Sequence, residues 1–270
     1  MLYSPEQVEA FPQTTFRYLL VSETDHVLTI RLNRPDKKNA LNPTLLNELA
    51  FALAYAHHTP GVWMVVLAAE GNVFCAGMDL KSLTEANTET ATVPEPSGPV
   101  RLGELMANLH KPCIAQVSGP VFAGGMLLVA GCTYVIASEE VKFGLPEVKR
   151  GLFPFQVMAS LIDIMPPRAV MDWCLSGRTL TAKQALSLGL VTDLVPVDQL
   201  QTTVNEHVYE LKQSSPTAMQ FGLRAYGQLK SLPRSEWQAY LYDQFSQIQQ
   251  TPDAQEGMAA FLEKREPRWM

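Results

Sequence analysis

Short runs of β-branched and aromatic residues alternate with longer helical patterns along the first two thirds of the chain. Residues 16–20 and 27–32 have strand composition and flank Ser22–Asp25, which has the composition of a turn, so we expect a β-hairpin. Residues 62–67 form a continuous apolar run whose length and branched side chains favour a strand buried on both faces. Residues 113–117 and 134–137 predict two more core strands.

Helical periodicity appears between these strands. Residues 44–56 carry leucines at four-residue spacing, with Pro43 near the start, and therefore predict an amphipathic helix. About ten residues before Lys111 predict a second helix, and residues 126–130 are apolar on all sides and predict a buried one. Because strands and helices alternate, we expect β-α units and a mainly parallel sheet.

The pattern changes after Pro196, where the chain becomes helical almost throughout. We expect helices near 198–213, 216–230, 234–250 and 253–265, separated by proline or polar breaks. The sequence therefore divides into an α/β core over residues 1–195 and a helical region over residues 196–270. Residues 84–100 are rich in Thr, Glu, Pro and Ser and predict a mobile surface loop.

Composition narrows the class of protein. The chain holds 21 Lys and Arg against 27 Asp and Glu, a net charge of −6, and lacks the basic surface that non-specific nucleic-acid binding needs. No apolar run approaches the ~20 residues of a membrane span, and the first fifteen residues do not resemble a signal peptide. The spacing of Cys75, Cys113, Cys132 and Cys174 predicts neither a metal site nor a disulfide framework, and favours reduced thiols in a cytoplasmic protein.

Two segments each run from a predicted strand into a turn of small residues, at 72–81 and at 117–126. Glycine lets a ligand approach the main chain closely, and the second turn opens a helix whose first N–H groups are unpaired. Two such N–H groups that converge would stabilise a developing oxyanion. The alternative is that the Gly124-Gly125 pair only permits close packing. Neither turn matches a phosphate-binding loop.

The order of motifs resembles the enoyl-CoA hydratase/isomerase (crotonase) superfamily over residues 16–268. Six motifs carry this resemblance: Asn33-Arg34-Pro35 with Asn39-Ala40-Leu41-Asn42, Phe74 to Leu80, Gly124-Gly125, Phe143 to Glu147, Ala185 to Val191, and Gly257 to Arg265.

The resemblance implies a crotonase-like α/β spiral of β-β-α units whose helical C-terminal region builds homotrimers or pairs of trimers. It implies a coenzyme A thioester that enters as the substrate, with no resident cofactor and no metal. The N–H groups of Met78 and Gly124 would then bind the thioester oxygen.

The pattern of carboxylates bears on the reaction. Family hydratases use two glutamates, at positions that match Leu127 and Glu147 here, so one is missing. A single base beside an oxyanion site favours a shift of a 3-enoyl-CoA double bond to 2-enoyl-CoA, with Glu147 carrying the proton. We expect Leu127, Leu152, Phe153 and Phe155 to form a dry pocket that raises the pKa of Glu147. Hydration is the runner-up, followed by decarboxylation or another enolate reaction, and by a silent acyl-CoA-binding domain.

The resemblance also assigns binding residues. Lys81 and Lys264 would contact the nucleotide end of coenzyme A beside Phe261, unless they are exposed lysines without a ligand. We interpret Asp79 as a hydrogen-bond acceptor that fixes the loop, in preference to a catalytic base. Thr133 stands where many members have aspartate, and no consequence follows from the sequence. The predicted substrate-binding residues are Ala76, Met78, Asp79, Leu80, Lys81, Gly124, Leu127, Phe261 and Lys264.

Overall fold

A six-stranded sheet forms the centre of the computed structural model, which describes residues 1–83 and 89–269. The strand order is β1-β2-β3-β4-β6-β9, and only the β1–β2 pair is antiparallel. The mainly parallel sheet is therefore confirmed. The strands span β1 Leu19–Thr24, β2 Val27–Leu32, β3 Met64–Ala69, β4 Cys113–Val117, β6 Tyr134–Ser138 and β9 Asp193–Val195.

The first two strands form the predicted hairpin, but the prediction of its turn at Ser22–Asp25 is wrong. Strand β1 continues through Thr24, which pairs with Val27. Asp25 and His26 make the turn, with φ of 51° and 69°. Two left-handed residues match the right-handed twist of the flanking strands, which explains why so short a connection closes the hairpin.

A second, three-stranded sheet has no counterpart in the sequence prediction. Its strands are β5 Val121–Phe122, β7 Lys142–Gly144 and β8 Thr179–Thr181, in the order β5-β7-β8. Strands β5 and β7 run parallel, whereas β7 and β8 run antiparallel. Strands of two or three residues are too short to show a periodicity in sequence.

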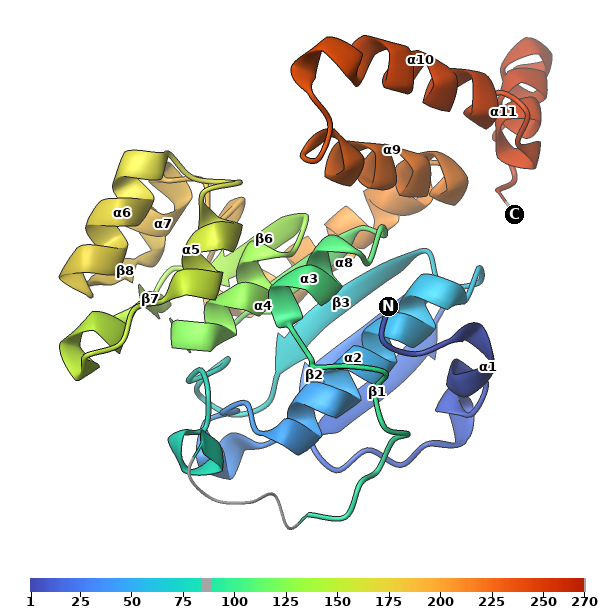
Figure 1. Ribbon diagram of the computed structural model, residues 1–270. Helices are drawn as coiled ribbons and strands as arrows, with labels where there is room; N and C mark the ends of the chain where they lie inside the picture. The colour runs from blue at the N-terminus through green and yellow to red at the C-terminus, as the bar shows by residue number, and fades with distance from the viewer. Residues whose placement is uncertain (84–88, 270) are drawn as a thin grey trace.

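The longest helix, α2 Pro43–His58, lies across the β1–β3 part of the large sheet (Figure 1). The side chain of Asn42 caps its N-terminus by accepting a hydrogen bond from the Leu45 N–H at 2.9 Å. Leu45, Leu49 and Leu53 are fully buried, as their spacing predicts. The other helices before residue 196 are α1 Pro5–Val8, α3 Leu102–Ala107, α4 Met126–Ala130, α5 Phe155–Leu161, α6 Pro167–Ser176 and α7 Ala182–Ser187.

Helix α8 Leu200–Lys212 packs on the other part of the sheet. Leu200 and Val204 contact a cluster formed by Val66, Ile114 and Ile136 of strands β3, β4 and β6. The chain thus turns helical where expected, yet α8 packs on the sheet of the region before residue 196. The division at 195/196 remains a prediction.

The last three helices extend away from the rest of the chain (Figure 1). They bury only a few of their side chains, namely Ala225, Asp253 and Ala260. Their bounds are α9 Pro216–Leu229, α10 Trp237–Ile248 and α11 Pro252–Glu263. No helix within the described ranges has the length and apolar content needed to cross a lipid bilayer.

Residues 89–100 form neither helix nor strand, as predicted, but they are held against the N-terminal part of the chain. The Thr92 hydroxyl donates to the carboxylate of the fully buried Glu48 at 2.6 Å, and the Tyr3 hydroxyl donates to the Pro94 carbonyl at 3.1 Å. These contacts run against the expectation of a freely mobile loop at 84–100. Residues 84–88 of that loop lie outside the described ranges.

Candidate active site

The two predicted glycine turns lie side by side at the edge of the small sheet. Cys75 and Val121 form a parallel bridge, in which Phe122 N–H donates to the Cys75 carbonyl at 2.9 Å. From this bridge the two segments continue in the same direction. Met78 follows Cys75 by three residues and Gly124 follows Val121 by three, so the bridge brings both predicted amides to one place.

The predicted acid emerges from the next strand of the same sheet. Strand β7 pairs parallel with β5, with Phe143 opposite Val121. After β7 the chain enters the 3₁₀ helix η5 Pro146–Arg150, which contains Glu147. Because the carboxyl ends of neighbouring parallel strands meet at one edge, Glu147 leaves the sheet beside the turn that contains Gly124.

Close backbone contact between the turns requires glycine at position 77. Gly77 has φ of +90°, and a Cβ atom there would lie 2.6 Å from the Ala123 Cβ and 3.1 Å from the Gly124 nitrogen. A Cβ atom on Gly124 would lie 3.7 Å from the Met78 nitrogen. The main chains of the two turns are therefore in van der Waals contact, and any side chain at position 77 would force them apart.

The orientation of the Met78 amide follows from its pairing with Leu41. Leu41 N–H donates to the Gly77 carbonyl at 2.8 Å, and Asp79 N–H donates to the Leu41 carbonyl at 2.9 Å. In a parallel bridge the residue between these two points its own N–H to the other side. Gly124 lies in the 3₁₀ helix η4 Ala123–Gly125, where first-turn N–H groups lack intrahelical partners. Two such amides have the chemistry to hydrogen-bond one carbonyl oxygen.

Asp79 is held in an ion pair. Its carboxylate accepts a hydrogen bond from the Arg34 guanidinium at 2.8 Å, and that arginine side chain is only 9% exposed. The hydrogen bond from Arg34 lowers the pKa of Asp79 below its ordinary value. An ionised carboxylate that is already engaged is a poor proton acceptor, so the contacts fit a loop-fixing residue.

Glu147 is half-buried, and its environment disfavours the charged form. Burial raises the pKa of Glu147, opposed by its backbone hydrogen bond and by the charge of Arg150. The Oε2 atom is inaccessible to solvent and has no hydrogen-bond partner among the residues that the structure describes. The pKa of the nearby Cys174 thiol on α6 is also raised, mainly by burial and to a lesser extent by the charge of Glu147. A poorly solvated carboxyl of this kind is suited to exchange a proton with a bound ligand.

The surroundings of Glu147 differ from the expected dry pocket. Leu127 is buried in α4 and packs close to Gly103 of α3, where an added Cβ atom would lie 3.6 Å from the Leu127 Cδ2 atom. Phe153 is half-buried, but Leu152 and Phe155 are 56% and 69% exposed. The expectation that all four side chains enclose the acid is therefore wrong for a single chain. The η5 segment precedes a surface loop, and this loop turns Leu152 outward.

The predicted coenzyme A residues fall into two separate groups. Ala76, Met78, Asp79, Leu80 and Lys81 follow one another along the first turn into the 3₁₀ helix η3 Leu80–Leu83, and Lys81 is exposed. Phe261 on α11 is 83% exposed, and Lys264 follows the end of that helix. Helix α11 lies at the opposite end of the molecule from residues 80–83 (Figure 1). One chain therefore does not bring Lys81 and Lys264 together.

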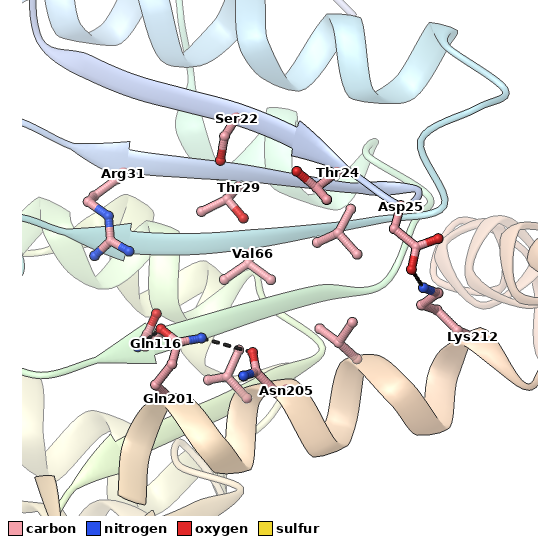
Figure 2. A pocket seen from close by; sticks show the side chains of 13 residues that line it. Ser22, Thr24, Asp25, Thr29, Arg31, Val66, Gln116, Gln201, Asn205 and Lys212 are labelled. Atoms are coloured by element: carbon pink, nitrogen blue, oxygen red, sulfur yellow. Dashed lines mark hydrogen bonds and ion pairs between the residues drawn. The ribbon is translucent and has the colours of Figure 1, made fainter. Parts of the chain in front are cut away.

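A polar groove lies away from these residues, on the face of the large sheet beside α8. It has a volume of about 370 Å³, and no predicted site residue lines it. Its charged side chains are already paired: Lys212 pairs with Asp25 (Figure 2), and Arg31 pairs with Glu70, which lies outside the groove. The groove is therefore separate from the residues around Glu147.

Two features of the site region had no predicted role. Arg34 belongs to the Asn33-Arg34-Pro35 motif, and its pairing with Asp79 needs the tertiary structure to be seen. Thr133 pairs with the first residue of β4: its N–H donates to the Cys113 carbonyl at 2.8 Å, and its hydroxyl accepts from the Cys113 N–H at 3.2 Å. Thr133 therefore fixes the first residue of strand β4.

Comparisons with known proteins establish the family to which the chain belongs. The sequence model of a family described as enoyl-CoA hydratase/isomerase matches residues 22–270. The mevalonyl-coenzyme A hydratase of Aspergillus fumigatus is 33% identical, over 97% of this chain and 97% of that protein. The 2,3-dehydroadipyl-CoA hydratase of Escherichia coli is 32% identical, over 92% of this chain and 97% of that protein. The crystal structure of an enoyl-CoA hydratase from Mycobacterium smegmatis has a TM-score of 0.83 at 28% identity, over 94% of this chain and 99% of that one. The chain therefore belongs to the enoyl-CoA hydratase/isomerase (crotonase) family.

Proposed function

We propose that this family member shifts the double bond of a 3-enoyl-CoA to give the 2-enoyl-CoA. The observation that carries the proposal is the single half-buried acid, Glu147, beside two touching glycine turns, with the buried Leu127 where a second acid would be needed for hydration.

The reaction needs one oxyanion site and one proton carrier. The thioester oxygen accepts hydrogen bonds from the N–H groups of Met78 and Gly124, which stabilise negative charge on that oxygen. The Glu147 carboxylate removes a proton from C2 and leaves a dienolate that extends from the carbonyl oxygen to C4. The same carboxyl group, now protonated, delivers its proton to C4, so the double bond moves from C3–C4 to C2–C3 and Glu147 is ionised again.

Hydration is the second candidate, and the names of two relatives favour it, since both are hydratases. Addition of water across C2=C3 needs a group that orients the water as well as one that protonates C2. The side chain of Leu127 can neither bind nor activate water. We therefore place hydration second, with Glu147 as its remaining acid.

The residues around Lys81 and those around Lys264 lie far apart in one chain, so the coenzyme A part would need both groups from different copies. We propose that Lys81 binds phosphate from one chain while Phe261 and Lys264 come from a second copy, in a homotrimer or a pair of trimers. The C-terminal helices support this assembly because they expose large apolar side chains, namely Tyr242, Phe245, Met258, Phe261 and Leu262. Coenzyme A enters as part of the substrate and no resident cofactor is invoked. A cytoplasmic location is proposed from the unpaired cysteines.

Two substrates distinguish the reactions. We expect the purified protein to convert 3-hexenoyl-CoA to 2-hexenoyl-CoA at least ~10²-fold faster than it hydrates crotonyl-CoA, because no second acid orients water. Chromatography of both product mixtures measures the two rates. Faster hydration would select the hydratase, and turnover of neither substrate would leave a domain that only binds acyl-CoA.

Removal of the acid tests the proton carrier. Glu147→Gln is expected to lower kcat about 10²–10⁴-fold without loss of fold, because an amide cannot accept the C2 proton. The base must be ionised, and burial raises its pKa, so kcat/KM of the native protein should rise with pH through a midpoint above 4.5, the ordinary value. A native profile without this acid limb, or turnover retained in Glu147→Gln, would remove Glu147 from the mechanism.

A methyl group at position 77 tests the contact between the turns. Gly77→Ala places a Cβ 3.1 Å from the Gly124 nitrogen at a left-handed φ, so we expect kcat to fall at least ~10²-fold. Gly61→Ala is the matched control, because a Cβ there meets no atom within 4 Å. Equal activity of the two variants would show that the spacing of the two amides does not matter.

The assembly is tested by charge on the C-terminal helix. Leu262 is 78% exposed in one chain, and Leu262→Asp should release monomers because a carboxylate is costly to bury in an apolar interface. Sedimentation velocity measures the mass of the particle. Leu20→Asp on β1 serves as the control for an exposed leucine outside the C-terminal helices. Monomeric native protein would contradict the proposal.

A further inference from the structure

We propose that Arg34 is a positioning residue that holds the Met78 amide in place, by bonding to both chain segments that flank it. The inference rests on the proposed role of Met78 as a donor to the thioester oxygen. Arg34 would support the Met78 amide without itself touching the substrate.

The guanidinium of Arg34 joins the two sides of the Leu41–Met78 bridge. One nitrogen, Nη1, donates to the Ala40 carbonyl at 3.0 Å and to the Asp79 carboxylate at 2.8 Å. Ala40 precedes Leu41 and Asp79 follows Met78, so the same nitrogen binds next to both residues of the bridge. Any displacement of the Met78 amide away from Leu41 would stretch one of these hydrogen bonds.

The main chain of Arg34 is itself fixed. Its N–H donates to the side chain of Asn39 at 2.8 Å, and its carbonyl accepts from the Asn39 N–H at 2.9 Å. The Asn39 amide also donates to the carbonyls of Glu70 and Val73, at 2.9 and 2.8 Å. The guanidinium therefore projects from a rigid base that is connected to the start of the first glycine turn.

The face of the Arg34 guanidinium lies over an aromatic ring. The Cζ atom of Arg34 lies 5.1 Å from the centre of the Tyr18 ring, within the range of a cation–π contact. The Tyr18 hydroxyl donates to the Glu89 carboxylate at 2.5 Å, and the Asn42 amide donates to the same carboxylate at 3.1 Å. Glu89 thus fixes the aromatic ring on which Arg34 rests.

Burial makes this ion pair different from others on the surface. The Arg34 and Asp79 side chains are 9% and 20% exposed, so removal of one partner leaves the other poorly solvated. A more exposed pair, Arg31 with Glu70, joins at 3.2 Å with side chains 31% and 43% exposed, and neither residue belongs to the Leu41–Met78 bridge. Arg31 is therefore a control for the loss of an arginine ion pair outside the bridge.

The test separates hydrogen bonding to the carbonyl oxygen from binding in general. Butyryl-CoA has the thioester oxygen and no double bond to react, whereas S-butyl-CoA is the thioether without that oxygen. Calorimetry gives Kd for both ligands. We expect the native protein to bind the thioester about 10-fold more tightly, and Arg34→Met to reduce this preference to about 2-fold while its Kd for the thioether stays unchanged. The variant should also lose kcat about 10–100-fold with little change in KM.

Controls make each result decisive. Arg31→Met should keep the native preference and kcat. Arg34→Lys keeps the charge but not the planar group that reaches two acceptors, so it should show an intermediate preference even if Arg34→Met does not fold. A native preference in both Arg34 variants, or an equal loss of affinity for both ligands, would overturn the inference. A native protein without any thioester preference would instead refute the proposed oxyanion site.

Discussion

Contact between two main-chain turns is the constraint on which the candidate site depends. The turns touch only because position 77 has no side chain and a φ that other residues rarely adopt. The same contact is held on both sides by short parallel bridges, Leu41 with Met78 and Cys75 with Val121. A site made of backbone amides is set by such bridges more than by the identity of the side chains around it, which explains why Met78 can present a flexible side chain.

The placement and the protonation of Glu147 depend on strand pairing and on burial, not on contact between the two turns. Glu147 follows the strand next to the second turn, and its partial burial raises its pKa despite the charge of Arg150. On the proposed function, two acids in such a place would share a water molecule, whereas a single acid has only the ligand with which to exchange a proton. On the proposed function, the buried Leu127 matters because its side chain has no polar atom that could hold a water molecule.

Much of this arrangement could be predicted from sequence because it is local. The apolar runs at 113–117 and 126–130 coincide with β4 and α4, and the leucine spacing identified α2. The small sheet escaped prediction because β5, β7 and β8 are two or three residues long and exist only through their pairing with one another. For the same reason the sequence identified Met78, Gly124 and Glu147 by resemblance but not the neighbours that hold them. Arg34 is separated from Asp79 by 45 residues, and only the folded chain brings them together.

The exposure of Leu152 and Phe155 bears on how such a site would become dry. Helix α6 lies near Glu147, since the charge of Glu147 helps to raise the pKa of the Cys174 thiol on that helix, whereas Leu152 and Phe155 stay exposed a few residues further along the chain. An acyl chain that covers them would remove apolar surface from water and displace the water nearest the carboxyl group. In that drier setting the hydrogen bonds from the two amides to the thioester oxygen would strengthen, because fewer water dipoles compete with them. On the proposed function, substrate binding thus completes the environment that the isolated chain only begins, and the apolar part of the substrate helps to activate its own reactive end.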